Sequence, residues 1–442
     1  MCGIVGYVGY DEAAGKIIEG LKKLEYRGYD SSGIAILSNK GIELNKCKGE
    51  IKNLENMIAG RVPSGTCGIG HTRWATHGAP SDVNSHPHMD QSGRVALVHN
   101  GIVENYVELK ETLVNEHGIK FKSETDSEVI AQLVGVKYNA NGGDLEKAVY
   151  DATKEMRGTY AIGVIAEDTP NKIVAYRKEA PLIAGLGKKS NFIASDIPAL
   201  LKYTNDIFLI ENDEMVICTP DSITIKDKDG KEVKREAMKI TWSVEDAEKG
   251  GYENFMLKEI NEQPKVVAET LNRRIDEDGK IKLDGINLTK EELDKYNKIY
   301  IVACGTAYHA GLVGKYVIEK MAGIAVEVDV ASEFRYRDPF IDEKTLFIAI
   351  SQSGETLDTL MSLRLAKEKG ARVLSVVNVV GSSIARESDD VFYTWAGPEI
   401  AVASTKAYTT QLVCMYLIAL YLGDIRGTLT DEYRKFILEE LQ

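Results

Sequence analysis

The first residue with clear chemical potential is Cys2, which follows the initiator methionine in the stretch MCGIVGYVGY. If Met1 is removed, Cys2 becomes the first residue and carries both a thiol and a free α-amine. An α-amine titrates near about 7.7 to 8.0 in model peptides, so it can accept the thiol proton at neutral pH, directly or through water. Cys2 is therefore a candidate nucleophile that brings its own base.

Two further motifs could hold a small zwitterion beside such a nucleophile. The stretch HTRWATHG contains Arg73, whose planar guanidinium suits a carboxylate, and Thr76 and His77 follow it closely. The stretch SETDSE places Asp126 at the expected start of a helix, where its carboxylate can meet an ammonium group. Together they predict a site for a free amino acid.

A third motif, HNG, supplies what an attacked carbonyl needs. Asn100 and Gly101 are expected at the end of an apolar strand, and they offer an amide donor and an open backbone N–H. These are the two ingredients of an oxyanion hole. An amino acid with an attackable side-chain carbonyl fits all three motifs, and glutamine has that structure.

These residues require two kinds of scaffold. Residues 2–240 alternate short strand-like runs with amphipathic helices, which predicts a layered α+β domain. Residues 286–442 repeat a strand, turn and helix rhythm with nearly continuous apolar strands, which predicts a doubly wound α/β domain with a parallel sheet. Residues 241–285, acidic at first and carrying Gly250 and Gly251, are interpreted as a linker and helical lead-in.

Composition narrows the functional classes. The net charge of −13 argues against nucleic acid or anionic membranes as partners. The six scattered cysteines include no CxxC pair, so we expect a reducing cytoplasm and no disulfide framework. The longest apolar run, Leu412 to Leu422, is shorter than the roughly 20 residues of a membrane span and predicts a buried helix. No cofactor is expected.

The first half resembles a known family through CGIVGY, LEYRGYDSSG, HTRWATHG, NSHPH, VHNGIVEN and SETDSEV. These motifs are similar to the glutaminase domain of class II, N-terminal-nucleophile amidotransferases, which have an αββα fold. The resemblance implies that Cys2 attacks the γ-amide of glutamine, forms a thioester and releases ammonia. It also implies the following roles: carboxylate binding by Arg73, Thr76 and His77, amine binding by Asp126, an oxyanion hole of Asn100 and Gly101, and an ammonia gate at Trp74.

In the second half, the turn of FIAISQSGETLDTL joins a buried strand to a helix. Hydroxyls and backbone N–H groups at a helix N-terminus form an anion site, and phosphate is its natural ligand. The turn ACGTAYHAG lies at the end of another strand and could face the same crevice. Plain helix capping by serine and threonine is the structural alternative for each turn. Neither has the spacing of a dinucleotide-binding turn.

The motifs ISQSGET, NVVGSSIARESD and GPEIAVASTKAYT resemble the SIS (sugar isomerase) phosphosugar-binding domain. A class II glutaminase joined to a SIS domain resembles the family of glutamine:fructose-6-phosphate amidotransferases. The resemblance implies glutamine and fructose 6-phosphate as substrates and a homodimer formed through SIS domains. It implies a sugar-phosphate site of Cys304, Thr306, Ser351, Gln352, Ser353, Thr356, Val402 and Ser404. Glu399 and Lys406 receive no catalytic role, because capping or ion pairing explains them as well.

Other interpretations stay open at this stage. A phosphosugar-binding regulatory protein with residual glutaminase activity would use the same SQSGET loop, and an N-terminal-nucleophile hydrolase of peptides is disfavoured by motifs that suit a small amino acid. Five of the seven histidines lie between His71 and His99, but no cysteine or carboxylate cluster accompanies them, so we expect hydrogen bonding rather than a metal. Arg27 could approach the nucleophile or form a structural ion pair.

Members of this family carry a second SIS lobe and a tail with a Schiff-base lysine. The sequence stops at Gln442. We therefore expect a truncated sequence without the isomerising residues, which acts as a glutaminase only.

Overall fold

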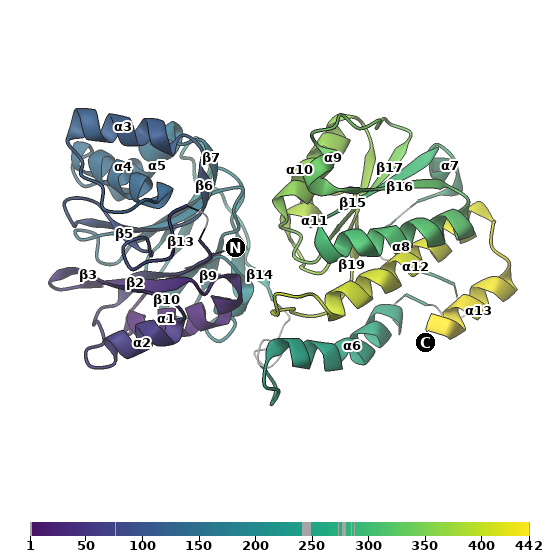
Figure 1. Cartoon of the computed structure of the whole chain (residues 1–442), viewed down its shortest axis with the longest axis horizontal. Helices are drawn as coiled ribbons and strands as arrows, with labels where there is room; N and C mark the ends of the chain where they lie inside the picture. The colour runs from purple at the N-terminus through teal and green to yellow at the C-terminus, as the bar shows by residue number, and fades with distance from the viewer. Residues whose placement is uncertain are drawn as a thin grey trace. The chain divides into compact units, whose positions relative to one another are not determined.

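A computed structural model describes residues 2–75, 77–240, 249–272, 274–275, 280–283, 285–286 and 288–441. The chain divides into two compact units, residues 1–247 and residues 248–442 (Figure 1). Each unit has its own core and is described by itself.

The first unit contains two antiparallel sheets. Their strand orders are β14-β11-β9-β10-β1-β4-β2-β3 and β13-β12-β8-β7-β6-β5. The strands are β1 (Gly3–Gly9), β2 (Ser31–Ser38), β3 (Gly41–Lys48), β4 (Cys67–Arg73), β5 (His88–Met89), β6 (Val95–Val103), β7 (Gly158–Ala166), β8 (Ile173–Lys178), β9 (Ile183–Leu186), β10 (Ser190–Ala194), β11 (Asp206–Leu209), β12 (Glu214–Cys218), β13 (Ile223–Lys226) and β14 (Met238–Lys239).

Helices cover the outer faces of both sheets, so the layers are α, β, β, α (Figure 1). The eight-stranded sheet is covered by α1 (Ala13–Leu24) and α2 (Ile51–Ile58), and the six-stranded sheet by α3 (Tyr106–His117), α4 (Asp126–Ala140) and α5 (Leu145–Glu155). Side chains such as Ile4 and Val98 fill the space between the sheets. Because β1 has a layer on each face, all of its residues are buried, which explains its continuous apolar sequence. The predicted layered α+β fold is confirmed.

The second unit is built on five parallel strands in the order β16-β15-β17-β18-β19. This order reverses between β15 and β17, and ligands of doubly wound sheets bind at such a switch point, beyond the carboxyl ends of the strands. The strands are β15 (Lys298–Ala303), β16 (Ala325–Val330), β17 (Thr345–Ser351), β18 (Arg372–Val377) and β19 (Asp390–Tyr393).

Helices lie on both faces of this sheet, as the predicted doubly wound fold requires (Figure 1). One face packs against α8 (Gly305–Ala322) and α12 (Lys406–Arg426), and the other against α9 (Ala331–Phe334), α10 (Leu357–Glu368) and α11 (Ser383–Glu387). The remaining helices are α6 (Phe255–Asn272), which packs on α12, α7 (Lys290–Leu293) and α13 (Asp431–Leu441).

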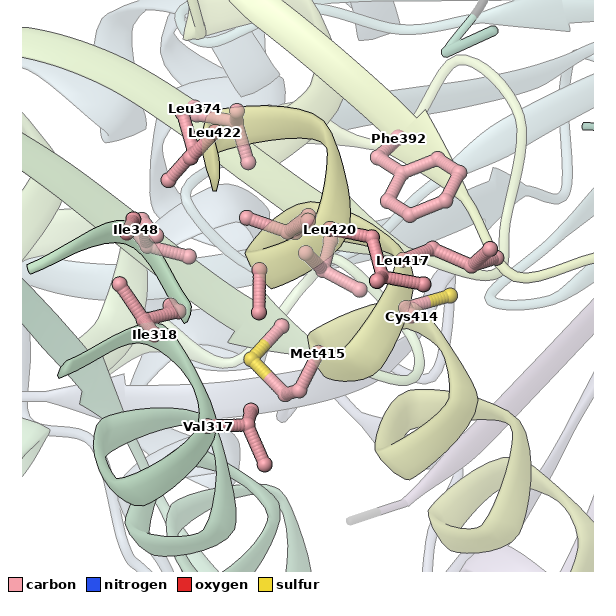
Figure 2. Close-up of a cluster of buried hydrophobic side chains, with 14 of the residues drawn as sticks. Val317, Ile318, Ile348, Leu374, Phe392, Cys414, Met415, Leu417, Leu420 and Leu422 are labelled. Atoms are coloured by element: carbon pink, nitrogen blue, oxygen red, sulfur yellow. The ribbon is translucent and has the colours of Figure 1, made fainter. Parts of the chain in front are cut away.

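The apolar run from Leu412 to Leu422 lies within α12, and its prediction as a buried helix is confirmed. Met415, Leu417 and Leu420 enter the same core as Ile318 of α8 (Figure 2). By length and composition α12 is the one helix in the described part of the chain that could cross a membrane, but most of its apolar stretch is buried inside the unit. Its hydrophobicity is therefore accounted for by the core.

Candidate active site

Cys2 directly precedes β1, which lies between β10 and β4 in the eight-stranded sheet. Gly3 pairs with Thr72 of β4, so Cys2 lies beside the point where the chain leaves that strand. There the Trp74 N–H donates to Cys2 Sγ at 3.2 Å, and the Trp74 carbonyl lies 3.5 Å from the same sulfur. Burial raises the pKa of the Cys2 thiol, while the Trp74 bond opposes that rise. The thiol therefore needs a base when it attacks.

Residues 28–30 pack against the backbone of residues 73–75, which includes the Trp74 groups that contact the Cys2 sulfur. A Cβ on Gly28 would lie 2.5 Å from the Arg73 carbonyl carbon, so only glycine permits this approach. The Asp30 N–H donates to the Arg73 carbonyl at 3.0 Å, and Asp30 Oδ2 accepts from the Ala75 N–H at 2.8 Å. This packing gives a structural reason for Gly28 and Asp30 in the LEYRGYDSSG motif.

Arg73 is 4% exposed, and its two terminal nitrogens differ in their contacts with the described residues. Nη2 donates to the carbonyls of His77 and Gly78, the latter at 3.0 Å. Nη1 is buried without a hydrogen-bond partner among the described residues, as is Nδ1 of His77. Burial lowers the pKa of Arg73 from its ordinary value. Because an unpaired buried donor is costly, this nitrogen marks a position where an anion would bind favourably.

Asn100 lies on β6, in the other sheet, and reaches the nucleophile. Its Nδ2 donates to the Cys2 carbonyl at 3.1 Å, and its Oδ1 lies 3.0 Å from Nε2 of His71. The expected end of the strand at Asn100 and Gly101 is wrong, because β6 continues to Val103 and pairs with β7. Gly101 has φ of +119°, and a Cβ there would lie 2.0 Å from the Thr159 carbonyl oxygen. The glycine is thus required inside the strand.

Asp126 is the first residue of α4 and is 4% exposed. Thr125 caps the helix by accepting from the Glu128 N–H, and Asp126 Oδ2 accepts from the Val103 N–H at 3.0 Å. Its nearest basic group within ion-pair distance in the described chain is Nδ1 of His99, at 4.0 Å. A buried carboxylate without a lysine or arginine partner suits an incoming ammonium group.

The remaining predicted residues of the first unit fall into different positions. Trp74 is 41% exposed and meets Tyr29 edge-to-face with ring centroids 5.5 Å apart. Thr76 lies outside the described residues. The buried guanidinium of Arg27 forms an ion pair with Asp196, with Nη2 and Oδ2 2.6 Å apart, as the structural interpretation of this residue expects. Within the described ranges, no group of histidine, cysteine and carboxylate side chains could hold a metal ion.

In the second unit, the turn after β17 is held together by hydrogen bonds among its own residues. Ser351 Oγ lies 3.0 Å from Thr356 Oγ1 and accepts from the Gly354 N–H at 3.0 Å, and Ser353 Oγ accepts from the Glu355 N–H at 3.2 Å. The Gln352 carbonyl is bonded to the segment after β18 through the N–H of residue 378 at 3.1 Å. Thr356 precedes α10 without a side-chain capping bond, so the simple capping alternative fails for this residue.

The turn after β15 lies on the other side of the switch point. Cys304 immediately precedes α8 and makes no side-chain capping bond, and Gly305 has φ of +60° with open space at its Cβ position. Thr306 is exposed at the helix N-terminus. Both turns therefore lie at the carboxyl ends of neighbouring parallel strands, the position expected for a ligand of this fold.

The GPEIAVASTKAYT segment leads into α12. Glu399 accepts from the N–H groups of Thr405 and Ala407 and from the Ser404 hydroxyl, so it caps the helix. Lys406 is 3% exposed and pairs with Glu262 at 2.6 Å. Val402 is 74% exposed at the tip of the segment.

Sequence reasoning missed the role of α6 beneath this segment. Glu259, 1% exposed, accepts from the N–H groups of Ile400 and Ala401 at 2.7 and 3.1 Å. Burial raises the pKa of Glu259. The contacts join residues about 140 positions apart, and no local motif announces them.

The comparisons with known proteins agree with this description. The family model "Glutamine amidotransferase domain" matches residues 71–202, and the model "SIS domain" matches residues 292–421. The chain is 59% identical over 441 residues to the glutamine–fructose-6-phosphate aminotransferase (isomerizing) of Clostridium tetani strain Massachusetts/E88, covering 100% of this chain and 72% of the relative. It is 58% identical to the enzyme of the same name from Clostridium perfringens strain 13/Type A, covering 99% of this chain and 72% of the relative.

Among solved structures, the C-terminal domain of glucosamine-fructose-6-phosphate aminotransferase from Francisella tularensis is 47% identical with a TM-score of 0.41, covering 44% of this chain and 54% of that one. The fold and the family models define a glutamine amidotransferase domain of the N-terminal-nucleophile type followed by a SIS phosphosugar isomerase domain. The chain belongs to the glutamine–fructose-6-phosphate aminotransferase (isomerizing) family.

Proposed function

We propose that this protein hydrolyses glutamine at Cys2 and that, in the full-length protein, the ammonia passes to fructose 6-phosphate to give glucosamine 6-phosphate and glutamate, whereas the 442-residue chain by itself acts as a glutaminase. The observation that carries the glutaminase part of this proposal is a pair of hydrogen bonds that two other residues donate to Cys2. Trp74 N–H donates to its sulfur at 3.2 Å, and Asn100 Nδ2 donates to its carbonyl at 3.1 Å. Two separate sheets thus hold the nucleophile and a candidate oxyanion donor together.

The chemistry follows from these groups after removal of Met1. Cys2 Sγ forms a bond to the amide carbon of glutamine, and the thiol proton passes through the freed α-amine to the leaving nitrogen. Negative charge on the amide oxygen is stabilised by Asn100 Nδ2 and the Gly101 N–H. Ammonia leaves, a thioester forms, and water then attacks it to release glutamate and regenerate the thiol.

Substrate recognition is assigned to the unpaired charges around this point. Arg73 binds the glutamine carboxylate through Nη1, which is buried and unpartnered in the described chain, with help from His77 and Thr76. Asp126 binds the amino group. Trp74, whose backbone touches the sulfur and whose ring is exposed, gates the departure of ammonia.

In the second unit, the two turns beside the sheet's switch point are assigned to the sugar phosphate. The hydroxyl and backbone N–H groups near the start of α10 suit phosphate, and α12's leading segment lines the sugar. The proposed ligand residues are Cys304, Thr306, Ser351, Gln352, Ser353, Thr356, Val402 and Ser404. We also propose a cytoplasmic homodimer joined through SIS domains, without nucleic-acid or membrane partners.

The test is an assay that measures glutamate and amino sugar separately. Cys2→Ala and Cys2→Ser are expected to abolish glutamate formation while the thermal unfolding midpoint is retained, and a chain that keeps Met1 is expected to be inactive. Cys47→Ala, which changes a buried cysteine on β3, serves as the matched control with normal activity. Glutamine hydrolysis by Cys2→Ala at the normal rate would refute the assignment.

The same assay addresses the 442-residue polypeptide by itself. With glutamine and fructose 6-phosphate present, we expect glutamate without amino sugar, because no lysine in residues 286–442 has a motif-based claim to form an imine. Substantial glucosamine 6-phosphate would place isomerising residues within this stretch. Sugar-phosphate binding with only residual glutamate formation would instead favour the regulatory alternative.

A further inference from the structure

His71, which is not among the proposed substrate contacts, connects the two sheets of the first unit next to Asn100. His71 lies on β4 and is 0% exposed. Its Nε2 lies 3.0 Å from the carbonyl oxygen of His99 and 3.0 Å from Oδ1 of Asn100, both on β6. One ring nitrogen thus contacts the backbone and the side chain of consecutive residues in the opposite sheet.

These two contacts fix the protonation of the ring and the orientation of the amide. A backbone carbonyl can only accept a hydrogen bond, so Nε2 of His71 must carry the proton. The atom of Asn100 that faces this N–H must then be its oxygen, because an amide nitrogen would place two donors against each other. Nδ2 of Asn100 is left pointing to the Cys2 carbonyl, 3.1 Å away.

The surroundings hold the ring neutral and in place. Burial lowers the pKa of His71 to about 3, so the imidazolium form does not compete near neutrality. The ring stacks on His86, with centroids 4.1 Å apart and planes 14° apart. His86 is anchored in turn, because its Nδ1 accepts from the His99 N–H at 3.3 Å. Flipping the His71 ring would put the Cε1–H group in the place of the Nε2–H group, and both hydrogen bonds would be lost.

We propose that His71 is a positioning residue that holds the Asn100 amide so that one Nδ2 N–H stays on the Cys2 carbonyl and the other can donate to the oxyanion formed at Cys2. This inference rests on the proposed glutaminase function and adds a residue that does not itself touch glutamine. Without the His71 donor, the amide can rotate, and its oxygen would then face the developing negative charge. The defect would appear in the chemical step rather than in substrate binding.

The test compares two variants of the 442-residue chain. His71→Met removes the donor and keeps an apolar side chain of similar reach, and we expect kcat to fall by about 10- to 1,000-fold, the upper limit being the loss of one oxyanion donor. KM for glutamine should change less than about threefold, because Arg73 and Asp126 are untouched. His71→Gln restores an N–H donor near the Nε2 position and should recover most of kcat.

A second measurement avoids turnover altogether. Glutamate γ-semialdehyde accepts the Cys2 thiol at its aldehyde carbon to give a thiohemiacetal whose oxygen occupies the oxyanion position. Its affinity should fall in His71→Met by a factor similar to that in kcat, while the affinity for glutamate stays constant. A purely structural role for His71 would weaken both ligands together.

Two controls separate the possible failures. Ile217→Ala opens a cavity on β12, which is separated from β6 by two strands, and it should lower the unfolding midpoint without altering kcat. In an Asn100→Ala background, His71→Met should cost no further activity, because the residue acts through that amide. An undiminished additional loss there, or normal kcat in folded His71→Met, overturns the inference. An inactive wild-type chain, by contrast, refutes the proposed function itself.

Discussion

Arg73→Ala is expected to weaken glutamine binding strongly and specifically. The side chain keeps Nη2 on two backbone carbonyls and leaves the buried Nη1 unpartnered among the described residues. A hydrogen bond to a charged group contributes about 1.5 to 3 kcal/mol, and a buried carboxylate left without its partner adds a further cost, so loss of this donor should cost about 2 to 4 kcal/mol of binding. That range corresponds to an increase of about 30- to 900-fold in KM for glutamine.

The assay is steady-state glutamate formation across a wide range of glutamine concentrations, with kcat and KM resolved. Glutamate, which has the same α-carboxylate, should lose affinity as a competitive inhibitor by a similar factor. Arg94→Ala is the matched control, since Arg94 lies at the surface with its side chain 39% exposed and paired to Asp168. Its KM should equal that of the wild type.

A second cause of a raised KM can be separated from lost charge. Arg73 also holds the carbonyls of His77 and Gly78, so its removal loosens that segment. Added guanidinium ion should lower the KM of Arg73→Ala if the missing charge matters, and should leave the control unaffected. An unchanged KM in the variant, or a raised KM with normal glutamate inhibition, would show that the carboxylate is bound elsewhere.

Two further predictions concern stability. Gly354→Ala should destabilise the second unit by about 1 to 3 kcal/mol, because φ is +65° and the new Cβ would lie 1.9 Å from Ser382 Oγ. Thermal unfolding tests this prediction, and an unchanged unfolding midpoint would contradict it. The first unit should lose stability in acid, because burial lowers the pKa of four histidines in the folded state while the unfolded chain protonates them below about pH 6.5. The free energy of unfolding should therefore fall as the pH drops below about 6.5 and be recovered above pH 7, and denaturant midpoints that match at pH 5 and pH 7 would exclude this. The histidines are His71, His86, His88 and His99.

The fold and the family could be predicted from sequence because their signals are local. Continuous apolar strands alternating with helices define the second unit, and short motifs identify both halves. The position of Asp126 at a helix start also follows from its neighbours, since Thr125 precedes it and caps α4. The family prediction is confirmed, whereas the roles given to individual site residues stay predictions.

Interactions between distant segments could not be predicted in the same way. The sequence shows five histidines close together, but it cannot show that His71 stacks on His86 and bonds across to the other sheet. Likewise, nothing near Lys406 indicates that its partner is Glu262 on α6. Such contacts depend on how sheets and helices pack, and the paired residues are far apart in the sequence: His71 and Asn100 by 29 positions, and Lys406 and Glu262 by 144.

The pairing of β1 has a consequence for the timing of synthesis. Val5 pairs with Ala194 of β10, so the strand that follows the nucleophile lacks one neighbour until nearly 190 further residues have been made. At about 5 to 20 residues per second, that delay is about 10 to 40 s. The proposed removal of Met1 can take place in this interval, while the terminus is still unpaired and open to an aminopeptidase. Catalytic competence then arises only after the chain has closed around its own beginning.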